Sequence, residues 1–200
     1  MPQPTQPGQE FEIFAPYEAF YIEGMLFCTE SALNYADYVS AAIQAGPGSG
    51  YEATDALHHL RNIVLQAAAL SRYFWPTSKK KAEAARYAAR GALLRKALSV
   101  ADESPLNFKP PHPRNQMEHF DEYLDDYLQR GVVGQIIPYY FGPAFDSQGV
   151  PQHFFQAYFT DTGVFEILGE RYPVQPIVEE LARIHGLLVA ASQSGGRLPK

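Results

Sequence analysis

TDALHHLRNIVLQAAALSRYFW, residues 54–75, is the clearest secondary-structure signal in this chain. Its apolar side chains recur every three or four residues, which is the period of one face of an α-helix. Pro76 follows directly and cannot continue a helix. The segment therefore predicts a helix that buries one face against its neighbours. The residues on that face are Leu57, Leu60, Val64, Ala68 and Ala69.

Three further helices are expected around this one. Residues 16–44 begin with Pro16 and are apolar almost all round, as in a helix that is buried or that also faces a partner. Its Tyr and Phe residues are therefore expected in the core or in a dimer interface. Ser78 is a suitable N-cap for a helix that continues to residue 100. After a loop, residues 113–130 form the fourth helix, which Gly131 is expected to end.

The pattern changes after the fourth helix. Residues 134–149 are rich in Pro, Gly and aromatic side chains and are predicted to form a loop. Residues 153–159 and 164–168 have strand composition and flank Asp-Thr-Gly, a hairpin turn signal. A last helix is expected over residues 176–192. The predicted fold class is mainly α: a four-helix bundle followed by a small β-hairpin and a C-terminal helix.

The length of 200 residues is enough for one domain. We expect a single domain over residues 11–192, in which residues 16–130 are the core bundle. The hairpin and the last helix, residues 150–192, are then an appendage to that bundle. The polar, Pro- and Gly-rich ends, residues 1–10 and 193–200, predict disordered tails.

The composition also bounds the compartment and the partners. The single cysteine, Cys28, excludes an intrachain disulfide framework and is typical of a reducing compartment. The sequence shows neither a secretion signal nor an apolar run of about 18 residues. We therefore expect a cytoplasmic protein with no membrane partner.

The net charge of −6 argues against a general nucleic-acid binder, but the charge is uneven. Residues 79–114 contain nine Lys and Arg and only three Asp and Glu. One interpretation is an ordinary solvated helix face. The other is a local basic surface that leads to Arg114.

Arg114-Asn115-Gln116-Met117-Glu118-His119 carries the strongest chemical signal. Pro113 can take the first helical position, which places Arg114 and Asn115 in the first turn and His119 one turn further on. A helix start and an arginine attract anions, and a histidine transfers protons near neutral pH. This combination suits a phosphodiester. The alternative is that Arg114 and Asn115 are solvated first-turn residues and that His119 packs in the core.

Arg114-Asn115-xxx-His119, at the start of the last helix of a four-helix unit, resembles the signature of the HEPN superfamily. That signature is an Arg, then four to six residues, then a His, with a polar residue, often Asn, directly after the Arg. Residues 114–122 look like the form found in uncharacterised HEPN-like bacterial proteins, and residues 71–76 and 90–95 are also similar to that group. The resemblance covers residues 16–130.

This resemblance implies a homodimer in which the two copies of the motif meet in one cleft. It implies a metal-independent endoribonuclease of a defence or toxin–antitoxin system, which needs no cofactor and can have an antitoxin or regulatory protein as a partner. The products would be a 2′,3′-cyclic phosphate and a 5′-OH. The alternative within the superfamily is an inactive member that serves as a dimeric binding or interaction module.

Metal-free RNA cleavage needs a base for the 2′-OH, an acid for the 5′-oxygen and positive charge on the phosphate oxygens. We expect His119 as base or acid, with His119 of the second copy in the other role. Arg114 would hold the scissile phosphate, and Asn115 would orient the imidazole or the phosphate. Glu118 and Asp121 either support these residues or are plain surface carboxylates. The candidate substrate-binding residues are Lys109, Arg90 and Arg95.

Two other histidine positions need an interpretation. Asp55 and His58 share a helix face, and His119 could complete a metal site, which would make the protein a helical-bundle metalloprotein. The sequence offers no second carboxylate–histidine pair to support this. His112 lies between two prolines and is expected to be a solvated loop or cap residue.

Overall fold

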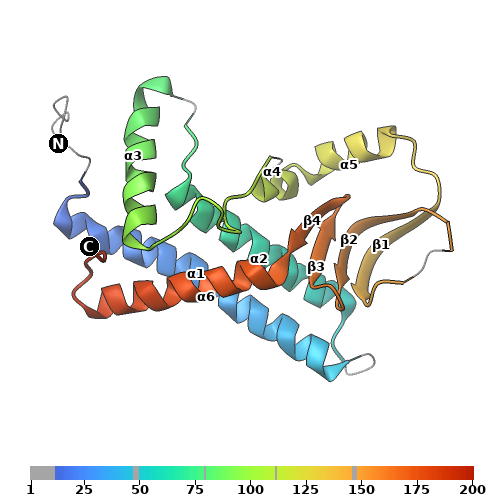
Figure 1. The fold of residues 1–200 in the computed structure, drawn as a ribbon. Coiled ribbons are helices and arrows are strands. Elements are labelled where there is room, and N and C mark those ends of the chain that lie inside the picture. Colours follow the sequence, from blue (N-terminus) through green and yellow to red (C-terminus); the bar gives the residue numbers. More distant parts are fainter. Residues whose placement is uncertain (1–11, 47–49, 79, 111, 146–147) are drawn as a thin grey trace.

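The computed structural model describes residues 12–46, 50–78, 80–110, 112–145 and 148–200, and the predicted tail 1–10 lies outside them. Six helices and four strands occur in these described residues (Figure 1). The helices are α1 (Ala15–Ala45), α2 (Ala53–Phe74), α3 (Lys81–Ala97), α4 (Pro113–Glu118), α5 (Phe120–Gln129) and α6 (Val174–Gln193). The strands are β1 (Gln135–Gly142), β2 (Gln152–Phe159), β3 (Val164–Ile167) and β4 (Glu170–Pro173). The prediction of a mainly α fold with a minor β element is confirmed.

Three long helices form the centre of the core. α2 packs along α1, and α6 packs against both of them (Figure 1). Met25 of α1, Leu60 of α2 and Leu181 of α6 are completely buried in one continuous cluster. Each buried side chain of this size contributes roughly 1.5–3 kcal/mol. The amphipathic face predicted for residues 54–75 is therefore what holds α2 between its neighbours.

The structure differs from the predicted bundle of residues 16–130. α6 is no appendage, because its apolar side chains enter the same core as those of α1 and α2. The predicted helix 113–130 is two helices, interrupted at His119, whose φ of −114° and ψ of 40° are not helical. After this break α5 lies beside the sheet rather than along α2 (Figure 1). The backbone at Gly131, with a φ of 77°, ends α5 as predicted.

α3 begins later than predicted. Lys80 occupies the N-cap position, and the helix starts at Lys81. The hydroxyl of Ser78 accepts a hydrogen bond from the Lys80 N–H at 3.1 Å, which closes a turn ahead of the helix. Ser78 therefore shapes the approach to α3 and is not its N-cap.

Gly91 lies where α3 contacts the end of α2. A Cβ at this position would clash with the carbonyl oxygen of Phe74 and would lie 2.7 Å from Cδ of Pro76. A backbone oxygen cannot move aside as a flexible side chain can. Gly91→Ala is therefore expected to lower the free energy of unfolding by about 1–3 kcal/mol, although alanine favours helices.

Gly186 on α6 is the matched control for Gly91. A Cβ there meets no described atom within 4 Å. Gly186→Ala is expected to raise the free energy of unfolding by roughly 0.5–1 kcal/mol, because alanine loses less conformational entropy on folding. Urea unfolding of both variants measures the difference. Stabilisation by both substitutions would show that the contact at Gly91 imposes no constraint.

The four strands form one sheet in the order β1-β2-β3-β4. The predicted hairpin is confirmed, since β2 and β3 pair antiparallel around the turn at residues 160–163. The prediction of a loop over residues 134–149 is wrong, because β1 lies within it and pairs parallel to β2. The register pairs Ile137 with Phe154 and Tyr139 with Gln156, and passes over Pro138 between them. An edge strand tolerates such a proline, which a central strand does not.

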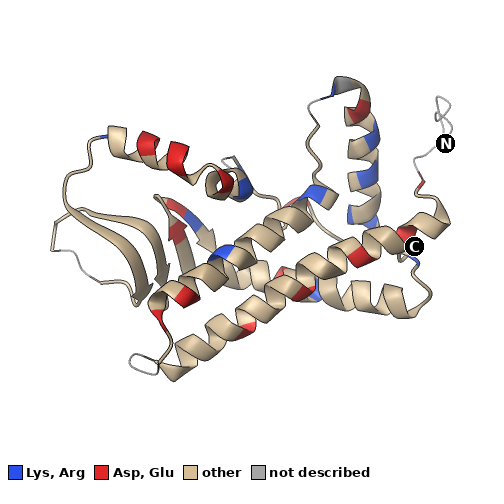
Figure 2. Cartoon of the chain, turned by 180° about the vertical axis from the view of Figure 1, so that it is seen from behind, with Lys and Arg blue, Asp and Glu red and all other residues tan. Residues whose placement is uncertain are grey.

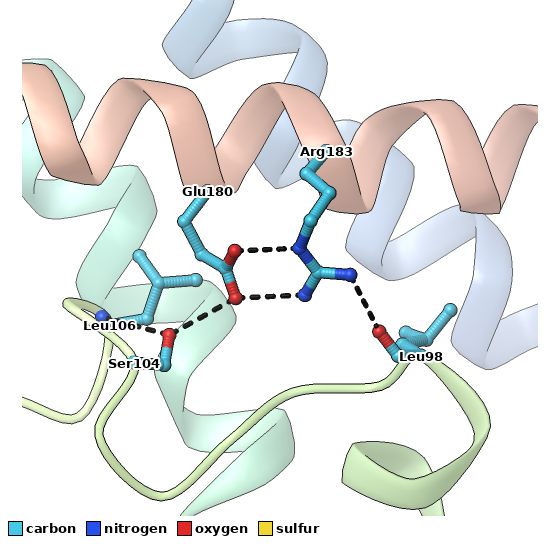
Figure 3. A network of polar contacts seen from close by, with 5 residues as sticks. All are labelled: Leu98, Ser104, Leu106, Glu180 and Arg183. Carbon is cyan, nitrogen blue, oxygen red and sulfur yellow. Dashed lines mark hydrogen bonds and ion pairs between the residues drawn. The ribbon is translucent and has the colours of Figure 1, made fainter.

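A polar network joins α6 to the segment that follows α3 (Figure 3). Arg183 donates two hydrogen bonds to the carboxylate of Glu180, at 2.7 and 2.8 Å, and a third to the carbonyl of Leu98 at 3.0 Å. The hydroxyl of Ser104 donates to Glu180 at 3.2 Å and accepts from the N–H of Leu106. These bonds anchor the segment that leads to α4.

The chain after α6 does not form the expected disordered tail. Arg197 donates to the carboxylate of Glu18 on α1 at 2.9 Å, and the N–H of Leu198 donates to the same group at 2.8 Å. The hydrogen bond from Arg197 holds the pKa of Glu18 below its ordinary value. Leu198 is buried, so the C-terminal residues contribute to the core. None of the helices in the described ranges combines the length and hydropathy that a membrane span requires.

Candidate functional site

α4 carries the motif and is held in place by a buried glutamine. Gln116 is 1% exposed, and its amide donates to the carbonyl of Ile167 in β3 at 3.0 Å. The hydroxyl of Tyr172 in β4 donates to the amide oxygen of Gln116 at 2.7 Å. On the other side, Arg61 of α2 donates to the carbonyl of Met117 at 2.9 Å. α4 is thus fixed between α2 and the sheet, with Arg114 and Asn115 exposed.

Arg114 forms an ion pair with Glu118 on the surface of α4. Its Nε donates to a carboxylate oxygen of Glu118 at 2.6 Å, and both side chains are 48% exposed. Glu118 is therefore a partner of Arg114, which was one of the two roles considered for it. Exposed pairs of this kind contribute only about 0.2–1 kcal/mol, so an anionic ligand can compete for the guanidinium.

His119 lies at the junction of α4 and α5. Its side chain is 56% exposed, which rules out the alternative of a core histidine. Nδ1 lies 3.4 Å from a carboxylate oxygen of Glu122. Glu122 is therefore the carboxylate beside His119, a role that the sequence suggested for Asp121. The N–H of His119 donates to the carbonyl of Asn115 at 2.9 Å, which keeps these two residues one turn apart.

Asn115 also lines an open cleft of about 820 Å³ beside α4. Its walls come from the end of α2, the turn at residues 75–78, the described residues between 107 and 115, and Tyr123 of α5. Among the described residues that line the cleft, none is acidic, and several are aromatic or basic. The basic residues are Arg72 and His112, and the aromatic residues are Trp75, Phe108 and Tyr123.

His112 is the N-cap residue of α4, one of the two positions expected for it, but it is half-buried in this cleft rather than solvated. Its ring lies edge-on to Phe108, with the ring centres 5.7 Å apart. Burial lowers the pKa of His112, and the positive charges of Arg72 and Arg114 lower it further. The Nδ1 atom of His112 and the Nε atom of Arg72 are both buried without a hydrogen-bond partner in the described part of the chain. Arg72 belongs to residues 71–76, which are part of the resemblance to HEPN-like proteins, but no local pattern in that segment assigns Arg72 to a site.

The lowered pKa of His112 predicts a pH dependence of stability. The unfolded chain binds the proton more tightly than the folded protein does, so stability is lost as the pH falls through 6.5, the ordinary value, toward the folded pKa. His112→Asn is expected to remove this part of the decrease. Urea unfolding between about pH 5 and pH 8 measures it. Identical pH profiles of the two proteins would contradict the assignment.

Arg90 and Arg95 contact the carboxyl end of α2. Arg90 donates to the carbonyl of Arg72 at 3.2 Å, and Arg95 donates to the carbonyl of Phe74 at 2.5 Å. Cations are favourable at this end of a helix, where carbonyl groups lack partners. The two arginines predicted to bind substrate therefore hold α3 against α2. Lys109 is exposed, between cleft residues Phe108 and Pro110.

The charges separate along the molecule. Figure 2 shows Lys and Arg along α3 and Asp and Glu along α5. The acidic residues of α5 are Asp121, Glu122, Asp125 and Asp126. The candidate site at α4 lies between these two regions (Figure 1).

The histidines of α2 have local roles. His59 donates from Nδ1 to the carbonyl of Asp55 at 2.7 Å and stacks on Tyr38 at 3.9 Å between ring centres. Within the described ranges, no group of three His, Cys, Asp or Glu side chains is close enough to hold a metal ion. The helical-bundle metalloprotein therefore receives no support from the geometry.

Comparison with protein-family models, curated protein sequences and solved structures gives no match for this chain. The class of the protein is therefore defined by its own fold and site. It is a mainly helical protein with a small mixed sheet, in which a cleft with basic and aromatic walls includes Asn115 of the short helix α4, and α4 also carries the exposed Arg114 and ends at the exposed His119.

Proposed function

We propose that this protein is a metal-independent endoribonuclease of HEPN type that acts as a homodimer. The observation that supports this proposal is the position of Arg114, Asn115 and His119. All three lie on or at the end of one short helix and are accessible to solvent, and Asn115 lines a cleft whose described lining is free of carboxylates. This arrangement offers positive charge, a hydrogen-bonding amide and a titratable imidazole to a phosphodiester.

The proposed reaction uses the 2′-OH of RNA as the nucleophile. The 2′-oxygen forms a bond to phosphorus while the bond to the 5′-oxygen breaks. One His119 takes the 2′ proton, and His119 of the second copy gives a proton to the 5′-oxygen. Arg114 leaves its ion pair with Glu118 and binds the phosphate oxygens, where negative charge develops. The products are a 2′,3′-cyclic phosphate and a 5′-OH.

The exposed aromatic residues at the start of α1 support a homodimer. Phe20 and Phe27 are 75% and 67% exposed, and Phe14 and Tyr17 extend the patch with ring centres 5.1 Å apart. The sequence predicts the aromatic residues of this helix in the core or in a dimer interface, and these four are outside the core. A contiguous exposed apolar patch marks an interaction site, and we propose a second copy of the chain as its partner.

A second function deserves to be tested beside the first. Nε of Arg114 already donates to the carboxylate of Glu118, and the carboxylate of Glu122 on α5 lies 3.4 Å from Nδ1 of His119. Both features favour an inactive HEPN-like module that binds a partner instead of cleaving RNA. In either case the proposed setting is a toxin or defence system with an antitoxin or regulatory partner.

The test is incubation of the purified protein with a mixed RNA pool in excess EDTA, with the solution mass determined in parallel. Cleavage that leaves cyclic-phosphate ends is the expected result. Intact RNA in the presence of a folded dimer would overturn the nuclease and favour the binding module. Cleavage that EDTA abolishes would instead indicate a metal-dependent enzyme.

A further inference from the structure

The cleft beside α4 contains two polar side chains that the chain leaves unsatisfied. Nε of Arg72 and Nδ1 of His112 are buried, line the same cleft and have no hydrogen-bond partner among the described residues. Buried polar atoms are bonded in the great majority of native structures, so each exception needs an explanation. The described residues leave three such atoms, of which Nε of Arg90 lies outside this cleft, and the two that share the open cleft point to a ligand that enters from solvent.

The positive charge of the cleft indicates that this ligand is an anion. Arg72 and Arg114 both act on His112, and their repulsion helps to lower its pKa. Glu118 partly neutralises Arg114, but the described cleft lining contains no carboxylate to neutralise Arg72. The guanidinium of Arg72 is held in place by a hydrogen bond from its terminal nitrogen to Oγ1 of Thr77. A fixed arginine with a free Nε–H is suited to an oxyanion, phosphate above all.

The walls of the cleft specify the rest of the ligand. Trp75, Phe108 and Tyr123 line the same cleft as the basic residues, and Asn107 and Asn115 add neutral hydrogen-bonding groups. Aromatic side chains stack on nucleobases without strong sequence preference. A volume of about 820 Å³ lies in the range of small-molecule sites. Phosphate beside aromatic rings is the chemistry of a nucleotide.

We propose that this cleft binds one nucleotide of a single-stranded nucleic acid, with its phosphate on Arg72 and His112 and its base against the aromatic wall. The inference deepens the proposed function, because Asn115 belongs both to this cleft and to the motif. The nucleotide in the cleft would be a neighbour of the scissile phosphate near His119. The cleft would then set where along the strand RNA is cut.

A DNA strand separates this inference from the proposed cleavage, since DNA lacks the 2′-OH nucleophile. The probe is a fluorescently labelled single strand of about five thymidines, whose binding is followed by anisotropy. Arg72→Gln is expected to weaken binding about tenfold, the loss of one charge-assisted contact. His112→Asn is expected to weaken it as well, and inorganic phosphate is expected to compete for the wild-type site.

Arg86→Gln is the matched control, because it removes the same charge from an exposed position on α3 beside the ring of Tyr87. Its effect on binding is expected to be less than about twofold. Equal losses in Arg72→Gln and Arg86→Gln would show that only bulk charge attracts the strand, and would overturn the site. Failure of the folded wild type to bind would overturn it as well. RNA cleavage in EDTA, measured separately, reports on the nuclease alone.

Discussion

His119→Ala is expected to lower the rate of RNA cleavage by about 10²–10⁴-fold, which is the usual contribution of a general acid or base. In the proposed dimer both copies lose the imidazole, so neither proton transfer has its side chain. The fold is expected to survive, because the side chain of His119 is 56% exposed. Among the described residues, its only close polar partner is the carboxylate of Glu122. Single-turnover cleavage in EDTA, with thermal unfolding measured on the same samples, tests both parts.

His58→Ala is the matched control for this experiment. His58 is an exposed histidine on α2 that does not line the cleft. Its removal is expected to leave cleavage unchanged. A His119→Ala protein that cleaves at the wild-type rate would exclude His119 from the reaction and point to a contaminating nuclease.

Gln116→Leu is expected to lower the free energy of unfolding by about 2–5 kcal/mol. The substitution keeps the size of the side chain but leaves the carbonyl of Ile167 and the hydroxyl of Tyr172 without their partner. Both groups are buried, and each unsatisfied buried group costs about 1–3 kcal/mol. Burial also raises the pKa of Tyr172, so its hydroxyl remains a protonated donor. Urea unfolding measures the loss.

Two further variants make the Gln116 result specific. Gln129→Leu changes an exposed glutamine at the end of α5 and is expected to alter stability by less than about 0.5 kcal/mol. Tyr172→Phe is expected to cost less when combined with Gln116→Leu than when made alone, because the two side chains share a hydrogen bond. Additive costs would show that this bond does not couple α4 to the sheet.

The helices were predictable because their signals are local. α2 spans Ala53–Phe74 where the spacing predicts 54–75, and α6 spans Val174–Gln193 where it predicts 176–192. Apolar period and prolines act within a few residues, so they place an element without knowledge of the rest. The hairpin of β2 and β3 was predictable for the same reason, since its turn residues lie between the paired strands.

β1 and the break at His119 were not predictable in the same way. Pro138 argues against a strand, and only pairing with β2 at the edge of the sheet makes residues 135–142 extended. No proline or glycine within residues 114–130 marks the end of α4. The break lets Tyr123 and Tyr127 of α5 pack beside the sheet, where the hydroxyl of Tyr127 lies 2.8 Å from Nδ1 of His153.

The sequence by itself determined that the chain is mainly helical and that Arg114, Asn115 and His119 lie within two turns of one another, because helix formation and residue spacing depend on near neighbours. Only the tertiary structure decided that His112 is half-buried and that Arg72, forty residues earlier, faces the same cleft. Arg72 and His112 come close to each other only because α2 and the segment that leads into α4 pack together. Contacts between such distant residues depend on the whole core, which no local pattern specifies.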